Sequence, residues 1–139
     1  MKTKQSITKK LNVTTDKAWS AISSIGQLDK WFPIISTCRV EGQGVGAHRY
    51  MSLEGGGAMT DVIEDVNHSQ RRLVYLRIES PFPVTYYRGT VEVFESYDAL
   101  AIVVWTADFE STPENSVPIA TLVKEAISAG IDGMEKDLN

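Results

Sequence analysis

Cysteine and long hydrophobic runs are nearly absent from this sequence. Cys38 is the only cysteine among the 139 residues, which excludes a framework of internal disulfides. The first ten residues, MKTKQSITKK, contain no apolar run of the kind found in signal peptides or membrane anchors. These absences favour a cytoplasmic protein that does not insert into a membrane.

Clustered positive charge is also missing. The formal net charge is −4, and neighbouring basic side chains occur only at Lys9-Lys10 and Arg71-Arg72. Binding of nucleic acid depends on groups of lysine and arginine that contact phosphates. We therefore expect no nucleic-acid partner.

Residue types that commonly hold metals or act as nucleophiles are scarce. His48 and His68 lie in different segments, and Cys38 has no second cysteine beside it. A metal site needs converging ligands, and no Ser-His-Asp or Cys-His arrangement is visible from the spacing. The glycine-rich stretches GQGVG and GGG lead into predicted strands, whereas a phosphate-binding loop leads into a helix. We expect neither a metal nor a cofactor.

What is present is the composition of a globular protein. With 139 residues, 42% of them hydrophobic, the chain is long enough to bury a core of its own. No repeat, low-complexity tract or linker interrupts it, so we predict one domain over residues 1–139.

The most regular pattern lies in residues 118–138 and predicts a helix about 30 Å long. Apolar side chains recur there at spacings of three and four, namely at Ile119, Leu122, Val123, Ala126, Ile127, Ile131 and Met134. Pro118 suits the first turn and Ser116 can cap it. Gly130 and Gly133 thin the second half of the helix, which fits either close packing against a strand or space for a ligand.

The rest of the chain predicts strands around two short helices. A first strand over residues 3–11 precedes a helix that begins at the cap Thr14 and ends at Gly26, and a second helical piece covers residues 28–31. Period-two segments separated by turn residues follow at 36–41, 47–53, 58–66, 72–79, 85–95 and 100–110. Short connections imply antiparallel pairing. We predict an α+β fold in which a seven-stranded antiparallel sheet curls around the C-terminal helix.

Four segments resemble motifs of one protein superfamily in the same order. They are V…W…WFP between residues 13 and 33, GVGAHR at 44–49, PFPVTYY at 81–87 and VWTADF at 104–109. Together they resemble the START-like, helix-grip SRPBCC superfamily over nearly the whole chain, and most closely its polyketide cyclase/dehydrase branch. The resemblance implies a helix-grip fold with an apolar cavity between the sheet and the C-terminal helix.

Members of that superfamily bind small hydrophobic molecules such as lipids, polyketides or hormones, and a minority catalyse cyclisation or dehydration. In the related abscisic-acid receptors two loops guard the cavity mouth, and they correspond here to residues 53–58 and 80–84. The lysine that anchors the hormone in those receptors falls near Ser36 in this chain. The resemblance therefore argues against a carboxylate hormone as the ligand.

Two side chains are candidates for catalysis. By resemblance Asp61 points inward, where burial would raise its pKa and make it a general base; the alternative is an acid that faces solvent. Tyr87 is the candidate for an inward hydroxyl that donates to a developing oxyanion; the alternative is a core tyrosine bonded to the backbone. Arg49 and Arg77 either pair with an inward acid or lie on the outer face.

The strand at 100–110 allows two orientations. Alternation places the apolar set that includes Trp105 toward the core, whereas the resemblance to the hormone receptors would turn Thr106 inward. We follow the alternation. The residues expected to bind a ligand are then Met51, Leu53, Asp61, Leu76, Ile78, Phe82, Tyr87, Trp105, Leu122, Ala126 and Gly130.

Two functions of different classes remain open from the sequence. The first is binding of a small hydrophobic molecule, with transport or metal-free cyclisation and dehydration as sharper variants. The second is a protein–protein interaction module, as in relatives that activate a chaperone or act on ribosome assembly. A homodimer is compatible with either. A carrier needs a cavity of about 300 Å³ or more, so cavity volume separates the two.

Overall fold

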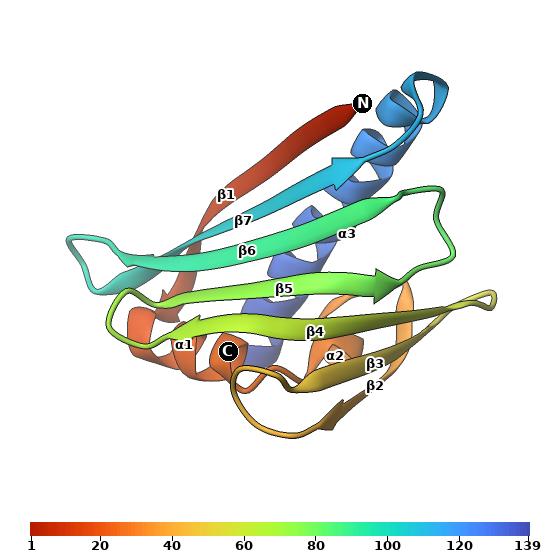
Figure 1. Cartoon of the computed structure of the whole chain (residues 1–139). Helices are drawn as coiled ribbons and strands as arrows, with labels where there is room; N and C mark the ends of the chain where they lie inside the picture. Colours follow the sequence, from red (N-terminus) through yellow and green to blue (C-terminus); the bar gives the residue numbers. More distant parts are fainter.

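The computed structural model describes all 139 residues, in one sheet and three helices (Figure 1). In chain order the elements are β1 (Lys2–Thr14), α1 (Thr15–Ser23), α2 (Leu28–Trp31), β2 (Ile35–Glu41), β3 (His48–Leu53), β4 (Ala58–Asn67), β5 (Arg72–Glu79), β6 (Tyr86–Glu95), β7 (Leu100–Glu110) and α3 (Pro113–Leu138). The sheet has the order β1-β7-β6-β5-β4-β3-β2, and every neighbouring pair is antiparallel. This confirms the predicted helix-grip fold.

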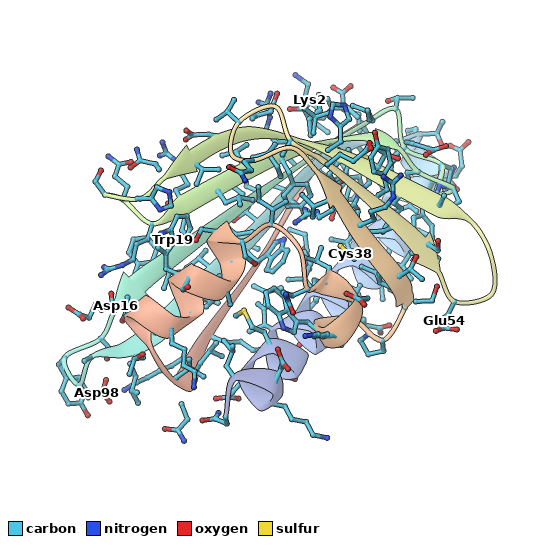
Figure 2. All side chains as sticks on the ribbon, turned by 90° about the horizontal axis from the view of Figure 1, so that it is seen from below. Lys2, Asp16, Trp19, Cys38, Glu54 and Asp98 are labelled. Atoms are coloured by element: carbon cyan, nitrogen blue, oxygen red, sulfur yellow. The ribbon has the colours of Figure 1, made fainter.

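The three helices lie on one side of the curled sheet (Figures 1 and 2). Helix α3 crosses the concave face and packs against β1 and α2. Trp19 of α1 and Trp31 of α2 are buried, and each indole N–H finds a partner 3.1 Å away, in His68 Nδ1 and Asp137 Oδ2 respectively. These bonds fix α1 to the β4–β5 turn and α2 to the end of α3.

Helix α1 begins as predicted but ends differently. The Lys17 backbone N–H donates to Thr14 Oγ1 at 3.3 Å, so Thr14 is the cap. At the other end the helix stops at Ser23, before the predicted Gly26, and Ile25 (φ 73°) and Gln27 (φ 76°) on either side of that glycine adopt the left-handed conformation. A β-branched residue rarely takes this conformation, and the Ile25 carbonyl is held there by the N–H of Arg49 Nη1 at 2.9 Å.

Helix α3 begins earlier than predicted, at Pro113 rather than Pro118. Pro113 takes the first-turn position, where a missing N–H costs nothing, and Pro118 lies inside the helix. Ser116 is therefore not the cap; its hydroxyl donates to the Pro113 carbonyl at 2.9 Å. The prediction placed the start at Pro118 because prolines are rare inside helices and common in the first turn.

Candidate functional site

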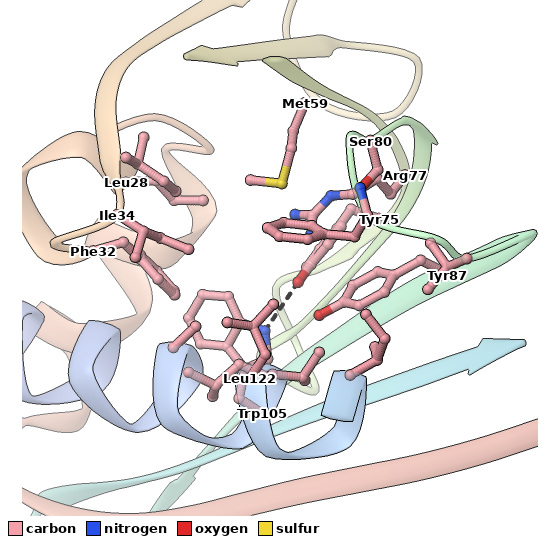
Figure 3. Close-up of a pocket in the computed structure, with 17 residues that line it drawn as sticks. Leu28, Phe32, Ile34, Met59, Tyr75, Arg77, Ser80, Tyr87, Trp105 and Leu122 are labelled. Carbon is pink, nitrogen blue, oxygen red and sulfur yellow. Dashed lines mark hydrogen bonds between the residues drawn. The ribbon is translucent and has the colours of Figure 1, made fainter. Parts of the chain in front are cut away.

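An apolar cavity lies between the inner face of the sheet and the N-terminal half of α3 (Figure 3). Helix α2 and the segment after it bound it on one side, and the loop at residues 80–84 bounds it on another. Its lining consists of Leu28, Phe32, Ile34, Ile35, Met59, Tyr75, Arg77, Ser80, Phe82, Val84, Tyr87, Trp105, Ile119, Leu122, Val123, Ala126 and Ile127.

The cavity is small in this structure, about 60 Å³. Ligand pockets usually measure about 300 Å³ or more, so a drug-sized molecule fits only if part of the lining moves outward. Two parts of the lining lie outside helices and strands, namely the loop at residues 80–84 and the segment with Phe32 and Ile34. At this volume, the interior of the protein resembles a filled core more than the open cavity of a carrier protein.

Five of the residues expected to bind a ligand line this cavity. They are Phe82 from the loop, Tyr87 from β6, Trp105 from β7, and Leu122 and Ala126 from α3. The alternation of strand β7 thus gave the right face for Trp105, which is 3% exposed. Thr106 lies on the outer face, within hydrogen-bonding distance (3.1 Å) of the Ser6 hydroxyl.

Strand β5 presents the opposite face from the one expected. Tyr75 and Arg77 line the cavity, whereas Leu76 is only partly buried and Ile78 is 54% exposed. Alternation along the strand allows only one of these pairs to point inward. The expectation for Leu76 and Ile78 is therefore corrected: their apolar character suggested the core face, but the arginine and the tyrosine occupy it.

Three further expected residues lie in the core away from the cavity. Met51 and Leu53 of β3 are buried but do not line it. Gly130 does not line it either, because a side chain at this position would overlap the ring of Phe32. A side chain at Gly133 would overlap the backbone of Trp31. The glycines of α3 therefore serve close packing, against α2 rather than against a strand.

Asp61 occupies the centre of a buried row of charges across three strands. The register places it opposite Arg49 of β3 and opposite Arg77 of β5. Its Oδ2 accepts hydrogen bonds from Arg49 Nε at 3.0 Å and Nη2 at 2.7 Å, and its Oδ1 accepts one from Arg77 Nε at 2.9 Å. The Asp61 side chain is fully buried, and Arg49 is 3% exposed. Both arginines thus pair with an inward acid, one of the two arrangements that the sequence left open.

This pairing reverses the expected pKa of Asp61. Burial alone would raise the pKa of the carboxyl, but the Arg77 and Arg49 guanidinium groups outweigh it and hold the pKa below its ordinary value. Asp61 also does not line the cavity. The expected raised pKa is wrong, because an ionised carboxylate that accepts bonds from two arginines is a poor proton acceptor.

Two tyrosines and the Trp105 indole add polar atoms to a lining whose polar residues are Arg77 and Ser80. The Trp105 indole N–H donates to the Tyr75 hydroxyl at 3.1 Å, and Figure 3 shows the Tyr75 and Tyr87 hydroxyls directed to the same side, toward α3. Burial raises the pKa of the Tyr87 phenol, while Arg77 opposes the shift. Tyr87 therefore stays protonated and remains a hydrogen-bond donor. The Arg77 guanidinium lies over its ring, 4.6 Å from the centroid.

Tyr75 and Arg77 line the cavity but were not among the residues expected to bind a ligand. Both share the face of Leu73 on β5, so the period-two pattern could have found them. Tyr75 also depends on a glycine across the sheet, since a side chain at Gly89 of β6 would overlap its ring.

No group of three or more His, Cys, Asp or Glu side chains is arranged to hold a metal ion. None of the helices combines the length and the apolar character required to cross a lipid bilayer.

Comparison with known families gives one match over almost the whole chain. The model of the family described as "Polyketide cyclase / dehydrase and lipid transport" matches residues 2–139. The sequence matches none of the curated proteins with which it was compared.

Solved structures share the fold at low sequence identity. A protein from Bacillus thuringiensis is 22% identical, with a TM-score of 0.84, and 98% of each chain is covered. The Zhui aromatase/cyclase from Streptomyces sp. R1128 is 16% identical, with a TM-score of 0.83, and 99% of this chain and 94% of that one are covered. A norcoclaurine synthase mutant from Thalictrum flavum, in complex with a transition state analogue, is 18% identical, with a TM-score of 0.79 and the same coverage.

Proposed function

The chain belongs to the polyketide cyclase/dehydrase and lipid transport family, and from this we propose that it binds a small hydrophobic molecule, such as a lipid or a polyketide, between α3 and the sheet. The observation that carries the proposal is the cavity itself, whose lining is almost wholly apolar and aromatic. Burial of apolar ligand surface there is worth about 0.8 kcal/mol per CH₂ group. A ligand with several such groups therefore gains enough to offset some opening of the lining.

The lining supports binding more than catalysis. Cyclisation and dehydration need a group that removes a proton, and the cavity is lined by no histidine, aspartate, glutamate or lysine. Asp61 is nearby, but its oxygens accept hydrogen bonds from both Arg49 and Arg77. A catalytic variant of the proposal would rest on Tyr87 and Arg77 as donors to an oxyanion, with the proton acceptor supplied by the substrate or by water.

The protein–protein module remains the second candidate, and the small cavity volume is the observation that favours it. Such a module needs no ligand and could keep its interior filled. The two candidates differ in whether enlarging a side chain in the cavity changes binding of an apolar molecule.

The test uses the neutral fluorescent probe N-phenyl-1-naphthylamine and one substitution in the lining. Ala126→Phe places a ring in the cavity and should weaken probe binding at least about tenfold, which corresponds to about 1.4 kcal/mol. Thr121→Phe, on the exposed side of the same helix, is the matched control and should leave binding unchanged. Molecules extracted from the purified protein and identified by mass spectrometry would name the natural ligand. If the wild-type protein binds no probe and carries no extractable molecule, the binding proposal is wrong.

A further inference from the structure

The charges beside the cavity do not balance. Arg49 and Arg77 together carry two positive charges, and Asp61 carries one negative charge. No second carboxylate lies within ion-pair distance of either guanidinium. The neighbouring Glu79 is exposed and accepts a hydrogen bond from Thr60 Oγ1 instead. One positive charge is therefore left without a carboxylate partner among mostly apolar side chains, with tyrosine rings as its only other neighbours of opposite polarity.

The surplus charge belongs to the arginine that reaches the cavity. Arg49 uses all three of its guanidinium nitrogens, two on Asp61 and one on the Ile25 carbonyl. Arg77 uses Nε and Nη2 on Asp61, and its Nη1 has no hydrogen bond to the chain. Thr3 Oγ1 is the only fully enclosed polar side-chain atom without a partner. Arg77 Nη1 therefore has accessible surface, and Arg77 lines the cavity.

The other polar side chains of the lining can donate hydrogen bonds, and none of them is a carboxylate. The Ser80 hydroxyl accepts a hydrogen bond from the Phe82 N–H at 3.2 Å, which leaves its own proton free to donate. Tyr87 is 6% exposed and lines the same end of the cavity as Arg77. No carboxylate lines the cavity. A lining that offers hydrogen-bond donors and a guanidinium without a carboxylate of its own fits an oxyanion.

We infer that the ligand of this cavity is an amphipathic acid, with an apolar body against α3 and a carboxylate or similar oxyanion against Arg77 Nη1, Tyr87 and Ser80. This inference rests on the proposed function and names its ligand class. It also revises the expectation drawn from Ser36, where the sequence lacks a lysine. Ser36 is exposed and does not line the cavity, whereas Arg77 of β5 does, so the proposed cation comes from another strand.

The first experiment needs no variant. Decanoate and decanamide have the same length and nearly the same shape, but only decanoate is charged at neutral pH. Each is titrated against the wild-type protein loaded with N-phenyl-1-naphthylamine. Hydrogen bonds to charged groups are the stronger class, so decanoate should displace the probe at a concentration at least about tenfold lower than decanamide. Equal displacement, or better displacement by decanamide, overturns the inference.

The second experiment assigns the preference to one side chain. In Arg77→Met the preference for decanoate should disappear, with decanamide affinity within about threefold of the wild type. Arg88→Met is the matched control, because Arg88 lies on the neighbouring strand and pairs with the exposed Glu64 at 2.8 Å. It should keep the preference. Equal weakening of both ligands in Arg77→Met would give Arg77 a purely structural role and refute the inference.

Failure of the binding proposal gives a different result from failure of this inference. If the wild-type protein binds no probe and carries no extractable molecule, both proposals fall. If the probe and decanamide bind but decanoate has no advantage, the binding function stands and only the acidic ligand class is wrong. The wild-type titration decides between these outcomes even if Arg77→Met does not fold.

Discussion

Replacing Asp61 with asparagine should lower the stability of the folded protein strongly. The amide is nearly the same size as the carboxylate, so the substitution removes charge and leaves the packing almost unchanged. Two buried guanidinium groups would then face each other across β4 without an anion between them. Breaking a buried ion pair by removing one partner typically costs about 3–5 kcal/mol. We expect a loss of that size, out of a total of about 5–15 kcal/mol for an ordinary domain.

The expected loss has a local and a distant part. Locally, the Asp61 oxygens accept from Arg49 at 2.7 and 3.0 Å and from Arg77 at 2.9 Å, and a neutral amide can accept at only one of its two ends. Farther away, Arg49 Nη1 holds the carbonyl of Ile25, whose positive φ is unfavourable for a β-branched residue. If Arg49 moves, the connection between α1 and α2 loses its anchor.

Urea unfolding followed by tryptophan fluorescence measures the effect, with Asp65→Asn as the control. Asp65 lies on the same strand, but its side chain is 41% exposed and its oxygen is 3.3 Å from Arg72 Nη2. An exposed pair of this kind contributes at most about 1 kcal/mol. If Asp61→Asn costs no more than Asp65→Asn, the row of charges does not stabilise the fold and the reasoning is refuted.

The pH dependence of the free energy of unfolding gives an independent check on the same carboxylate. The pKa of Asp61 is lower in the folded protein than its ordinary value, so its contribution is complete above the unfolded pKa of about 3.9. The contribution is lost as the pH falls through the lower folded pKa. The stability difference between the wild type and Asp61→Asn should therefore be constant near neutral pH and shrink below about pH 4.

Two glycine substitutions test the close packing. Gly130→Ala should destabilise by about 1–3 kcal/mol in thermal unfolding despite the better helix propensity of alanine, because the new methyl group meets Phe32; a gain in stability would contradict the packing. Gly89→Ala should cost a similar amount and alter the near-ultraviolet circular dichroism, because it displaces the Tyr75 ring that lies beside Trp105; an unchanged spectrum would contradict this contact.

The fold could be predicted because its signals are local. Turn residues separate the strands, period two marks each strand, and Thr14 marks the start of α1. The C-terminal end of α1 and the start of α3 could not be placed in the same way. Ile25 takes a conformation that its own side chain disfavours, because a distant arginine holds its carbonyl. Only the tertiary structure contains that information.

The candidate site shows the same difference between local sequence signals and tertiary contacts. Trp105 and Tyr87 followed from alternation and from the motif resemblance, since each depends on its own strand. Asp61 did not, because its pKa depends on which side chains the neighbouring strands place opposite it. Burial and pairing act on a carboxylate in opposite directions. The sequence left open whether Arg49 and Arg77 pair with this acid, and it therefore left the sign of the pKa shift undetermined.

Gly130 and Ala126 show why small residues on a helix do not by themselves mark a cavity. They are four positions apart on α3, so they lie on one face and are equivalent in the sequence pattern. The structure separates them through Phe32. Its ring packs against the Gly130 backbone and lies edge-on to Trp105, with 5.4 Å between the ring centroids, and it also lines the cavity beside Ala126. Phe32 therefore ends the cavity: on one side of its ring the small residue is needed for contact, and on the other it leaves space.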